Sequence, residues 1–363
     1  MPETEHSLEV RRDDLRVTRI VSTPVPATRD GQVALRVERF GLTANNVTYG
    51  VVGDRIGYWR FFPAAEGWGR IPVWGFANVM SSGVQEIPPG TRVFGFFPMS
   101  THLVVEPTGM SRHGFTDGSA HRTSLPPVYN GYRRVDVDAL LPATAEALHA
   151  VFYPLLATSF VIDDFLADQN DFGADRIVLS SASSKTALGT ALAVSHRSGD
   201  KPALVGLTSP QHVGFVERLG CYTEVTPYND VASLDPAAAT VYVDFAGNAD
   251  VRRAVHEHLG DALVKSYMVG ATHWEQRELP AELPGPVPTM FFAPAQISKR
   301  LEEWGSAGYQ ERLEPALERL IAAVSDSIAV VDVAGVEGLQ GAWLATLDGS
   351  SDPAVATVVE FGR

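Results

Sequence analysis

Apolar and polar residues alternate in short stretches over the first 150 positions, and Gly and Pro separate these stretches. Residues 33–40 follow the Asp30–Gly31 turn and alternate apolar with polar side chains, as a half-buried strand does. Comparable stretches occur at residues 15–20, 73–84, 91–97 and 101–105. Many short strands with such punctuation predict a closed or rolled β-domain over residues 1–150.

The pattern changes after residue 150 to apolar runs that alternate with helical stretches. Three strand-and-helix units and a fourth strand are expected at residues 177–197, 203–219, 240–259 and 263–270. Such alternation predicts a parallel, doubly wound sheet, here over residues 151–295. The fold class is therefore α/β, with a β-rich domain beside a Rossmann-type sheet.

Three further segments complete this outline. Residues 139–166 have a helical pattern that we expect to break at Tyr153–Pro154, at the domain junction. Residues 106–135 are irregular and are interpreted as a lid or an insertion beside a pocket. A charged helical stretch follows at 297–324, and the chain ends in a strand at 356–361.

Composition and charge narrow the classes of partner. The 363 residues are 45% hydrophobic and carry a formal charge of -14 at pH 7, which argues against a nucleic-acid or anionic-membrane surface. The charged N-terminus does not resemble a signal peptide, and the single cysteine, Cys221, excludes an internal disulfide. We expect a cytoplasmic protein that binds a small-molecule substrate.

Residues 176–189, R-I-V-L-S-S-A-S-S-K-T-A-L-G, predict a strand, a turn of small residues and a helix. This arrangement presents backbone N–H groups and a helix N-terminus to a phosphate. The alternative is an ordinary strand-to-helix turn capped by Ser. The S-S-K-T string also resembles a P-loop, but the required Gly-x-x-x-x-Gly-Lys spacing is absent.

The end of the second strand of the sheet bears on the choice of cofactor. A sheet that binds NAD usually places Asp or Glu here, about 20 residues past the phosphate turn, to accept from the ribose hydroxyls. The chain has Thr208, Ser209 and His212 instead. Hydroxyls can donate to a ribose 2′-phosphate that a carboxylate would repel, so NADP(H) is favoured over NAD. Alternatively, these residues cap the next helix.

Four segments carry a family resemblance. They are V-W-G-F-A-N-V-M-S-S-G-V-Q-E-I-P-P-G-T-R-V-F-G from Val73, P-L-L-A-T-S-F from Pro154, G-L-T-S-P-Q-H-V-G-F-V-E-R-L-G-C-Y from Gly206 and V-E-G-L-Q-G-A-W-L from Val336. With the order of the domains, they resemble the zinc-free quinone oxidoreductase and enoyl reductase branch of the medium-chain dehydrogenase/reductase superfamily. Within this type, the chain is similar to DUF2855, a domain of unknown function.

The resemblance implies a GroES-like first domain, a Rossmann cofactor domain and a segment, residues 296–363, that returns to the first domain. It also implies a homodimer formed by edge-strand pairing of the cofactor domains. The superfamily's Gly-Gly-Val-Gly run is replaced here by residues 183–188, S-S-K-T-A-L. Each added Cβ keeps the backbone farther from a pyrophosphate. Lys185 could offset this with its charge or could lie in solvent as a surface cation.

The resemblance also suggests where the chemistry takes place. Zinc-dependent relatives use Cys and His ligands that this chain lacks, so we expect no metal. Hydride delivery to a conjugated carbonyl or a quinone needs a donor for the developing enolate. Tyr58 matches the position of the enoyl reductase tyrosine, and Tyr49 that of quinone reductases; Asn46 could orient substrate or ribose. Either tyrosine could instead be a core aromatic.

His273 follows the fourth strand, where the superfamily places residues beside the nicotinamide; otherwise it is an ordinary loop histidine. The complete set of expected cofactor-binding residues is Ser181, Ser183, Ser184, Lys185, Thr186, Thr208, Ser209, His212, Tyr228, Gly247 and Gly270. The predicted function is a zinc-independent, NADPH-dependent reductase of an α,β-unsaturated carbonyl or a quinone. The alternative is a non-redox lyase, isomerase or ligand-binding protein with an altered cofactor loop.

Overall fold

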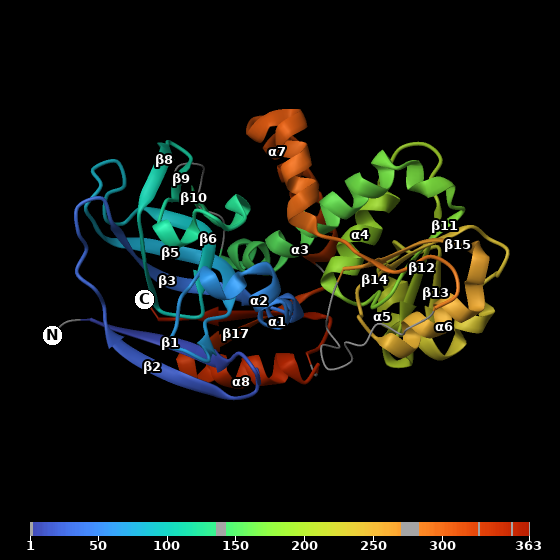
Figure 1. The fold of residues 1–363 in the computed structure, drawn as a ribbon, viewed down its shortest axis with the longest axis horizontal. Coiled ribbons are helices and arrows are strands. Elements are labelled where there is room, and N and C mark those ends of the chain that lie inside the picture. The colour runs from blue at the N-terminus through green and yellow to red at the C-terminus, as the bar shows by residue number, and fades with distance from the viewer. Residues whose placement is uncertain (1–2, 136–142, 270–282, 326, 350, 363) are drawn as a thin grey trace. The chain divides into compact units, whose positions relative to one another are not determined.

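The computed structural model describes residues 3–135, 143–269, 283–325, 327–349 and 351–362. The chain forms two compact units (Figure 1). The first unit consists of Met1–Tyr153 with Ile328–Arg363, and the second unit of Pro154–Ser327. The C-terminal return to the first unit therefore begins at Ile328, later than the residue 296 expected from the sequence.

The first unit is built on a nine-stranded, mainly antiparallel sheet. Its strand order is β17-β18-β3-β5-β6-β10-β9-β8, and β7 also pairs with β3. These strands are β3 (Val33–Leu42), β5 (Pro72–Ser82), β6 (Arg92–Pro98), β7 (His102–Val105), β8 (Pro107–Ser111), β9 (Gly114–Asp117), β10 (Gly131–Arg134), β17 (Ala329–Ala334) and β18 (Val355–Glu360). A small sheet of β1 (Thr4–Arg11), β2 (Thr18–Pro24) and β4 (Trp68–Gly69) accompanies it. The β-rich prediction is confirmed.

Residues 106–135 are more regular than the sequence suggested, where they were interpreted as a lid or an insertion beside a pocket. They contain β8, β9 and β10, which extend the large sheet, and two single-turn helices. The strands are only four or five residues long, so no alternation was visible in the sequence. Gly114 allows β9 to approach β10 closely, because a Cβ there would lie 2.1 Å from the Tyr132 carbonyl oxygen.

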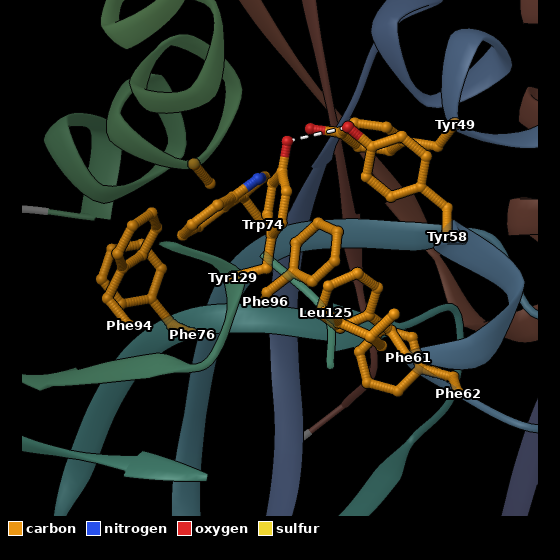
Figure 2. Close-up of a cluster of buried hydrophobic side chains, with 11 residues drawn as sticks. Tyr49, Tyr58, Phe61, Phe62, Trp74, Phe76, Phe94, Phe96, Leu125 and Tyr129 are labelled. Atoms are coloured by element: carbon orange, nitrogen blue, oxygen red, sulfur yellow. Dashed lines mark hydrogen bonds between the residues drawn. The ribbon is translucent and has the colours of Figure 1, made fainter. Parts of the chain in front are cut away.

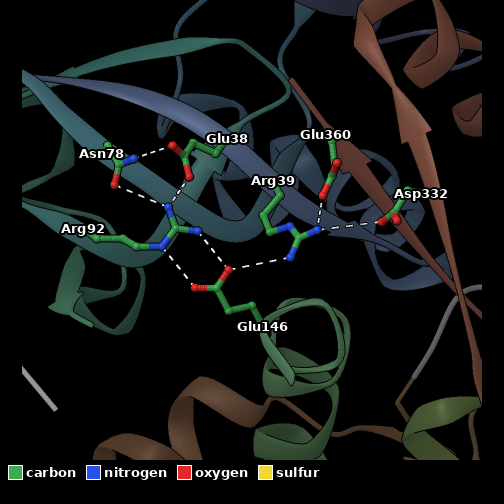
Figure 3. Close-up of polar contacts among 7 residues, drawn as sticks. All are labelled: Glu38, Arg39, Asn78, Arg92, Glu146, Asp332 and Glu360. Carbon is green, nitrogen blue, oxygen red and sulfur yellow. Dashed lines mark hydrogen bonds and ion pairs between the residues drawn. The ribbon is translucent and has the colours of Figure 1, made fainter. Parts of the chain in front are cut away.

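An ion-pair network ties distant segments of the first unit together (Figure 3). Arg92 on β6 pairs with Glu38 on β3 and, at 2.9 Å, with Glu146 at the start of α3 (Ala143–Asp168). Arg39 on β3 pairs with Glu360 on the C-terminal strand β18. These mostly buried side chains hold the returning C-terminal strands and α3 against β3 and β6.

Helix α3 continues through Pro154, so the break expected at Tyr153–Pro154 is wrong. A proline removes the hydrogen bond to the carbonyl four residues earlier, here that of Ala150. Gly41 lies against this carbonyl oxygen, since a Cβ built on Gly41 would be 2.7 Å from it. The close approach of β3 thus covers the helix where its own hydrogen bond is missing.

Helix α3 is also long and apolar enough to span a membrane by length and composition. About half of its most apolar stretch is buried inside the protein. Two of its aspartates form ion pairs with arginines of the second unit. Asp163 pairs with Arg197 at 2.6 Å, and Asp164 pairs with Arg300 at 2.6 Å. These ion pairs are what we expect of the core helix of a globular protein.

The second unit is a six-stranded, all-parallel sheet with the order β13-β12-β11-β14-β15-β16. Its strands are β11 (Arg176–Leu179), β12 (Ala203–Thr208), β13 (Glu224–Pro227), β14 (Thr240–Asp244), β15 (Leu263–Met268) and β16 (Thr289–Met290). Helices α4 (Lys185–Ser195), α5 (Val213–Arg218) and α6 (Ala249–Leu259) connect successive strands. The chain order, 3-2-1-4-5-6, is that of a dinucleotide-binding sheet and confirms the Rossmann-type prediction.

Helix α7 (Ala293–Ser325) belongs to the second unit. Near its start, Arg300 pairs with Asp164 and with Asp168 of α3, at 2.6 and 3.0 Å. The sequence prediction assigned this helix to the C-terminal segment that returns to the first unit. Its packing on α3 is a tertiary contact that the helical pattern by itself does not specify.

Candidate functional site

The predicted phosphate turn links β11 to α4 in the second unit. Ser181 has a φ of 50°, in the left-handed region that glycine usually occupies. Its backbone N–H donates to the Tyr228 hydroxyl at 2.9 Å. Ser184 is the N-cap of α4 and its hydroxyl accepts from the N–H of Ala187 at 3.4 Å. The hydroxyls of Tyr228 and Ser184 thus stabilise a turn in which nucleotide-binding sheets usually have glycine.

A buried polar network lies directly behind this turn. Ser180 donates to Asp244 at 2.7 Å and accepts from the backbone N–H groups of Phe245 and Ala246. Asp244, which has no exposed surface, also pairs with Arg252 at 2.9 Å. The network ties the carboxyl ends of β11 and β14 together. Sequence reasoning missed it, although a Ser and an Asp directly at two strand ends were a usable signal.

Gly247 belongs to the same network. Its backbone N–H donates to Asp244 at 3.0 Å, and its φ is 67°. It therefore lies at the carboxyl end of β14, on the side of the sheet where dinucleotides bind in this fold. Gly270 and His273 lie outside the described residues.

Two glycines outside the turn allow the close packing that the missing turn glycines would provide. A Cβ on Gly206 of β12 would lie 2.9 Å from the Cβ of Ala182 in the turn. A Cβ on Gly189 of α4 would lie 2.6 Å from the Ser159 hydroxyl of α3. The turn and its helix therefore pack closely on β12 and α3 even though residues 183–188 contain no glycine.

The structure brings four predicted residues together at the end of β12. His212 Nδ1 lies 3.0 Å from the Ser209 hydroxyl and 3.3 Å from the Ser183 hydroxyl. Thr208 donates to Ser183 at 3.5 Å. This cluster of three hydroxyls and one imidazole joins the phosphate turn to the next strand end. It contains no carboxylate, so its donors fit a phosphorylated ribose better than a ribose diol.

The remaining predicted cofactor residues surround this cluster. Lys185 is the first residue of α4 and is half-buried, as is Thr186. The Thr186 carbonyl accepts from Ser159 at 2.8 Å, which fixes the first turn of α4. Burial raises the pKa of Tyr228 to about 12, so its hydroxyl is protonated at neutral pH. These positions stay predictions for cofactor binding.

The predicted tyrosines lie in the first unit, in an aromatic cluster (Figure 2). Tyr49 is on α1 (Ala44–Val51), and Tyr58 begins the single-turn helix η1 (Tyr58–Arg60). Their ring centroids are 4.6 Å apart, and the Tyr58 hydroxyl lies 2.8 Å from that of Tyr129. Burial raises the pKa of both tyrosines above the usual value, so both are proton-bearing donors at neutral pH.

Asn46 is buried on α1, and its side-chain amide forms hydrogen bonds with backbone groups. Its Oδ1 accepts from the N–H of Thr43 at 2.8 Å, and its Nδ2 donates to the Pro72 carbonyl at 2.8 Å. These contacts complete a capping box at the start of α1 and fasten the helix to β5. Asn46 therefore stabilises the local backbone. Its predicted contact with substrate or ribose stays a prediction.

Residues 40–352 match the model of the family described as "Protein of unknown function (DUF2855)". The chain belongs to the DUF2855 family. No curated protein matches it. The predicted family resemblance is therefore confirmed over most of the chain.

Solved structures show what fold this DUF2855 member has. A Mesorhizobium loti protein assigned as an NADPH:quinone reductase is 12% identical, with a TM-score of 0.60 and 99% coverage of both chains. S. aureus TarJ in complex with NADPH is 9% identical, with a TM-score of 0.60, covering 99% of this chain and 100% of that chain.

A mutant form of enoyl thioester reductase from Candida tropicalis is 10% identical, with a TM-score of 0.55, covering 99% of this chain and 100% of that chain. Similarity at these identities is similarity of fold. This DUF2855 protein therefore has the medium-chain reductase fold, with a GroES-like unit and a Rossmann unit.

Proposed function

We propose that this DUF2855 protein is a zinc-independent, NADPH-dependent reductase of an α,β-unsaturated carbonyl or quinone substrate. One observation carries the proposal: Ser183, Ser209 and His212 converge at the end of β12, where an NAD-binding sheet would place a carboxylate. The fold resembles that of a protein solved with NADPH, which agrees with this choice of cofactor.

The second unit would hold the cofactor. The Ser181–Lys185 turn and the N-terminus of α4 would receive the pyrophosphate, and the hydroxyl and imidazole cluster would receive the 2′-phosphate. Gly247, at the end of β14, would lie along the cofactor. When bound, NADPH supplies a hydride, and the chain has to supply the matching proton.

Tyr58 is the proposed proton donor. A tyrosine hydroxyl carries its proton at neutral pH, and the partner Tyr129 can return a proton along their 2.8 Å contact. Tyr49, with its ring 4.6 Å from that of Tyr58, is the alternative donor. Zinc independence agrees with a chain whose one cysteine, Cys221, is buried with a pKa raised to about 12.

Cofactor titration tests the proposal. Purified protein is titrated with NADPH and, separately, with NADH, while the fluorescence of the reduced cofactor is followed. We expect NADPH to bind more tightly, because the cluster at the end of β12 lacks a carboxylate. If neither cofactor binds at millimolar concentration, the proposal is wrong.

Replacing Tyr58 tests the proton donor. Tyr58→Phe should abolish most of the turnover, by about 10² or more for a lost general acid, while NADPH affinity stays at the wild-type value. Steady-state rates and cofactor titration are measured on the same preparation. Unchanged turnover would remove Tyr58 as the donor and leave Tyr49→Phe as the next variant.

A non-redox function is the second candidate, and one observation favours it. The Ser181 N–H, which a cofactor phosphate would be expected to use, donates instead to Tyr228. If this contact persists in solution, the turn is closed to a pyrophosphate and the scaffold serves a lyase, an isomerase or a binding protein. Mass spectrometry of the native protein separates the two cases. If NADP(H) co-purifies with the protein, the turn is open to a pyrophosphate and the non-redox candidate is wrong.

A further inference from the structure

The cluster that contains Tyr58 also contains buried polar hydrogen atoms, on tyrosine hydroxyls and on one indole. Tyr58 and Tyr129 share one hydrogen bond, which uses one of their two hydroxyl hydrogens. The indole N–H of Trp74 is buried and makes no hydrogen bond of normal geometry within the part of the chain that the structure describes, although it interacts with the Tyr49 hydroxyl. An unpartnered buried donor costs about 1–3 kcal/mol, so a group outside this cluster is expected to pair with it.

These donors lie at one end of the aromatic cluster. Figure 2 shows the hydroxyls of Tyr49, Tyr58 and Tyr129 and the indole nitrogen of Trp74 together, at the end away from Phe61 and Phe62. The ring centroids of Trp74 and Tyr129 are 6.2 Å apart. The Trp74 side chain is 7% exposed, so water has little access to its N–H.

The walls around these donors are flat and apolar. Phe96 packs on Tyr129 with ring centroids 4.7 Å apart, and Tyr153 packs on Trp74 at 5.3 Å. Burial raises the pKa of Tyr129 well above its usual value, so this hydroxyl also keeps its proton. Neutral donors inside an aromatic wall suit a neutral acceptor on a planar molecule and disfavour a charged ligand, whose desolvation they could not offset.

We propose that Trp74 Nε1 and the Tyr58–Tyr129 hydroxyl pair bind the carbonyl oxygen of a planar, apolar substrate such as an aromatic enone. A carbonyl oxygen has two lone pairs, which match one indole N–H and one remaining hydroxyl hydrogen. Trp74 and Tyr129 thereby become carbonyl-binding residues, neither of which the sequence identified. The choice of an enone rests on the proposed function; the count of donors does not.

The test measures the carbonyl directly. Benzylideneacetone carrying ¹³C at its carbonyl is bound to the cofactor-free protein, and its C=O stretch is recorded by infrared difference spectroscopy. Hydrogen bonds in the wild-type protein should lower this frequency. In Trp74→Phe and in Tyr129→Phe, the frequency should move toward its value in an apolar solvent, and the probe should bind about threefold to tenfold more weakly, as expected for one lost hydrogen bond.

Tyr132→Phe is the matched control. The Tyr132 hydroxyl is also buried in the first unit and donates to the Phe96 carbonyl at 2.8 Å, but its ring packs on Phe97 and Phe115, outside the aromatic cluster. This variant should lower the melting temperature without changing the probe frequency.

Melting curves of all variants, recorded beside the spectra, separate loss of the site from loss of the fold. If Trp74→Phe does not fold, the spectrum of Tyr129→Phe decides the question.

Two results would overturn the inference: an unchanged C=O frequency in both variants, or no binding of the probe to the wild-type protein at millimolar concentration. The proposed function is judged separately, by NADPH titration of the same proteins. A protein that binds the probe through Trp74 and Tyr129 but binds no NADPH would keep the carbonyl site and lose the reductase.

Discussion

Single side chains decide the chemistry that each unit can perform. In the second unit, hydroxyls of Ser and Thr occupy positions where glycine and a carboxylate are usual in nucleotide-binding sheets. In the first unit, buried tyrosines have a pKa above the usual value, so their hydroxyls act as neutral hydrogen-bonding groups. Lys185 lies beside the proposed phosphate site, and burial lowers the pKa of His149 in the first unit.

Lys185→Ala should weaken NADPH binding by about tenfold or more, the usual cost of losing a charge-assisted hydrogen bond. Lys185 starts α4 and is half-buried, next to the turn proposed for the pyrophosphate. Fluorescence titration measures the effect, and Lys201→Ala, at an exposed lysine whose ammonium donates to the Ser195 carbonyl, is the control. Equal NADPH affinity in Lys185→Ala and wild type would place this cation outside the site.

His149 should make the first unit sensitive to acid. Burial, with the nearby charge of Arg133, lowers its pKa to about 3. The unfolded chain binds a proton here below about pH 6.5 whereas the folded chain does not, so stability falls as the pH drops from about 6.5 toward 3. At pH 5 this loss amounts to about 2 kcal/mol.

His149→Phe tests this dependence, because the ring would keep its packing on Phe94, whose centroid is 4.6 Å away. Urea unfolding at pH 7.5 and pH 5 should show a smaller loss of stability on acidification in the variant than in the wild type. Other buried histidines, such as His102 and His256, are present in both proteins. Their contribution to the pH dependence therefore cancels when the variant is compared with the wild type. The same loss in both proteins would contradict the assignment.

At the scale of elements, close approach of backbones shapes both units. Gly41 brings β3 against the carbonyl of α3 that Pro154 leaves without its helical partner, and Gly189 brings α4 against α3. Ser159 on α3 donates to the Thr186 carbonyl at the start of α4, which fixes the two helices beside the proposed phosphate turn. The position of α4 therefore depends on a glycine outside the turn.

Gly189→Ala should lower the free energy of unfolding by about 1–3 kcal/mol, the usual cost of an overpacked core. Its Cβ would meet Leu156 at 2.5 Å and the Ser159 hydroxyl at 2.6 Å. Gly341→Ala is the matched control, since it lies in helix α8 (Gly335–Leu347) and a Cβ there would meet no atom of the described residues within 4 Å. That variant should gain up to about 1 kcal/mol from helix propensity. A neutral or stabilising Gly189→Ala would contradict the packing.

At the scale of the whole molecule, each unit has its own sheet and its own core. The core of the second unit surrounds Val178, Tyr242 and Leu259, and that of the first unit includes the aromatic cluster around Tyr58 and Phe96. The two sets of predicted site residues are divided in the same way, with the proposed cofactor residues in the second unit and the tyrosines in the first.

We propose that the protein is a homodimer formed through β16, at the edge of the parallel sheet. Val287, Met290 and Phe292, in and around this strand, are 84%, 42% and 39% exposed, and they are half of the large exposed hydrophobic side chains among the residues described. An apolar sheet edge with exposed side chains favours pairing with a second copy. Val287→Asp should shift the mass in light scattering from dimer to monomer.

Val331→Asp is the control for this substitution, since Val331 is 46% exposed on β17 in the first unit. It should leave the mass of the dimer unchanged. A monomeric wild-type protein, or a Val287→Asp protein that remains dimeric, would contradict pairing through β16.

The sequence by itself determined the architecture. Apolar runs alternating with helices implied the parallel sheet, because strands buried on both faces need continuous apolar side chains. The turn after β11 and the hydroxyl residues after β12 could also be placed, because strand ends in such a sheet meet at one edge. Residues 208–212 and Ser183 accordingly lie together in the structure.

Only the tertiary structure decided how individual groups are used. The Ser180–Asp244–Arg252 network, the continuation of α3 through Pro154 and the burial of the Trp74 N–H all depend on contacts that close the tertiary structure. Periodicity and spacing carry no information on such contacts, because they describe neighbours along the chain. Hydrogen bonding and burial are set by neighbours in space, and these assign each candidate residue its surroundings.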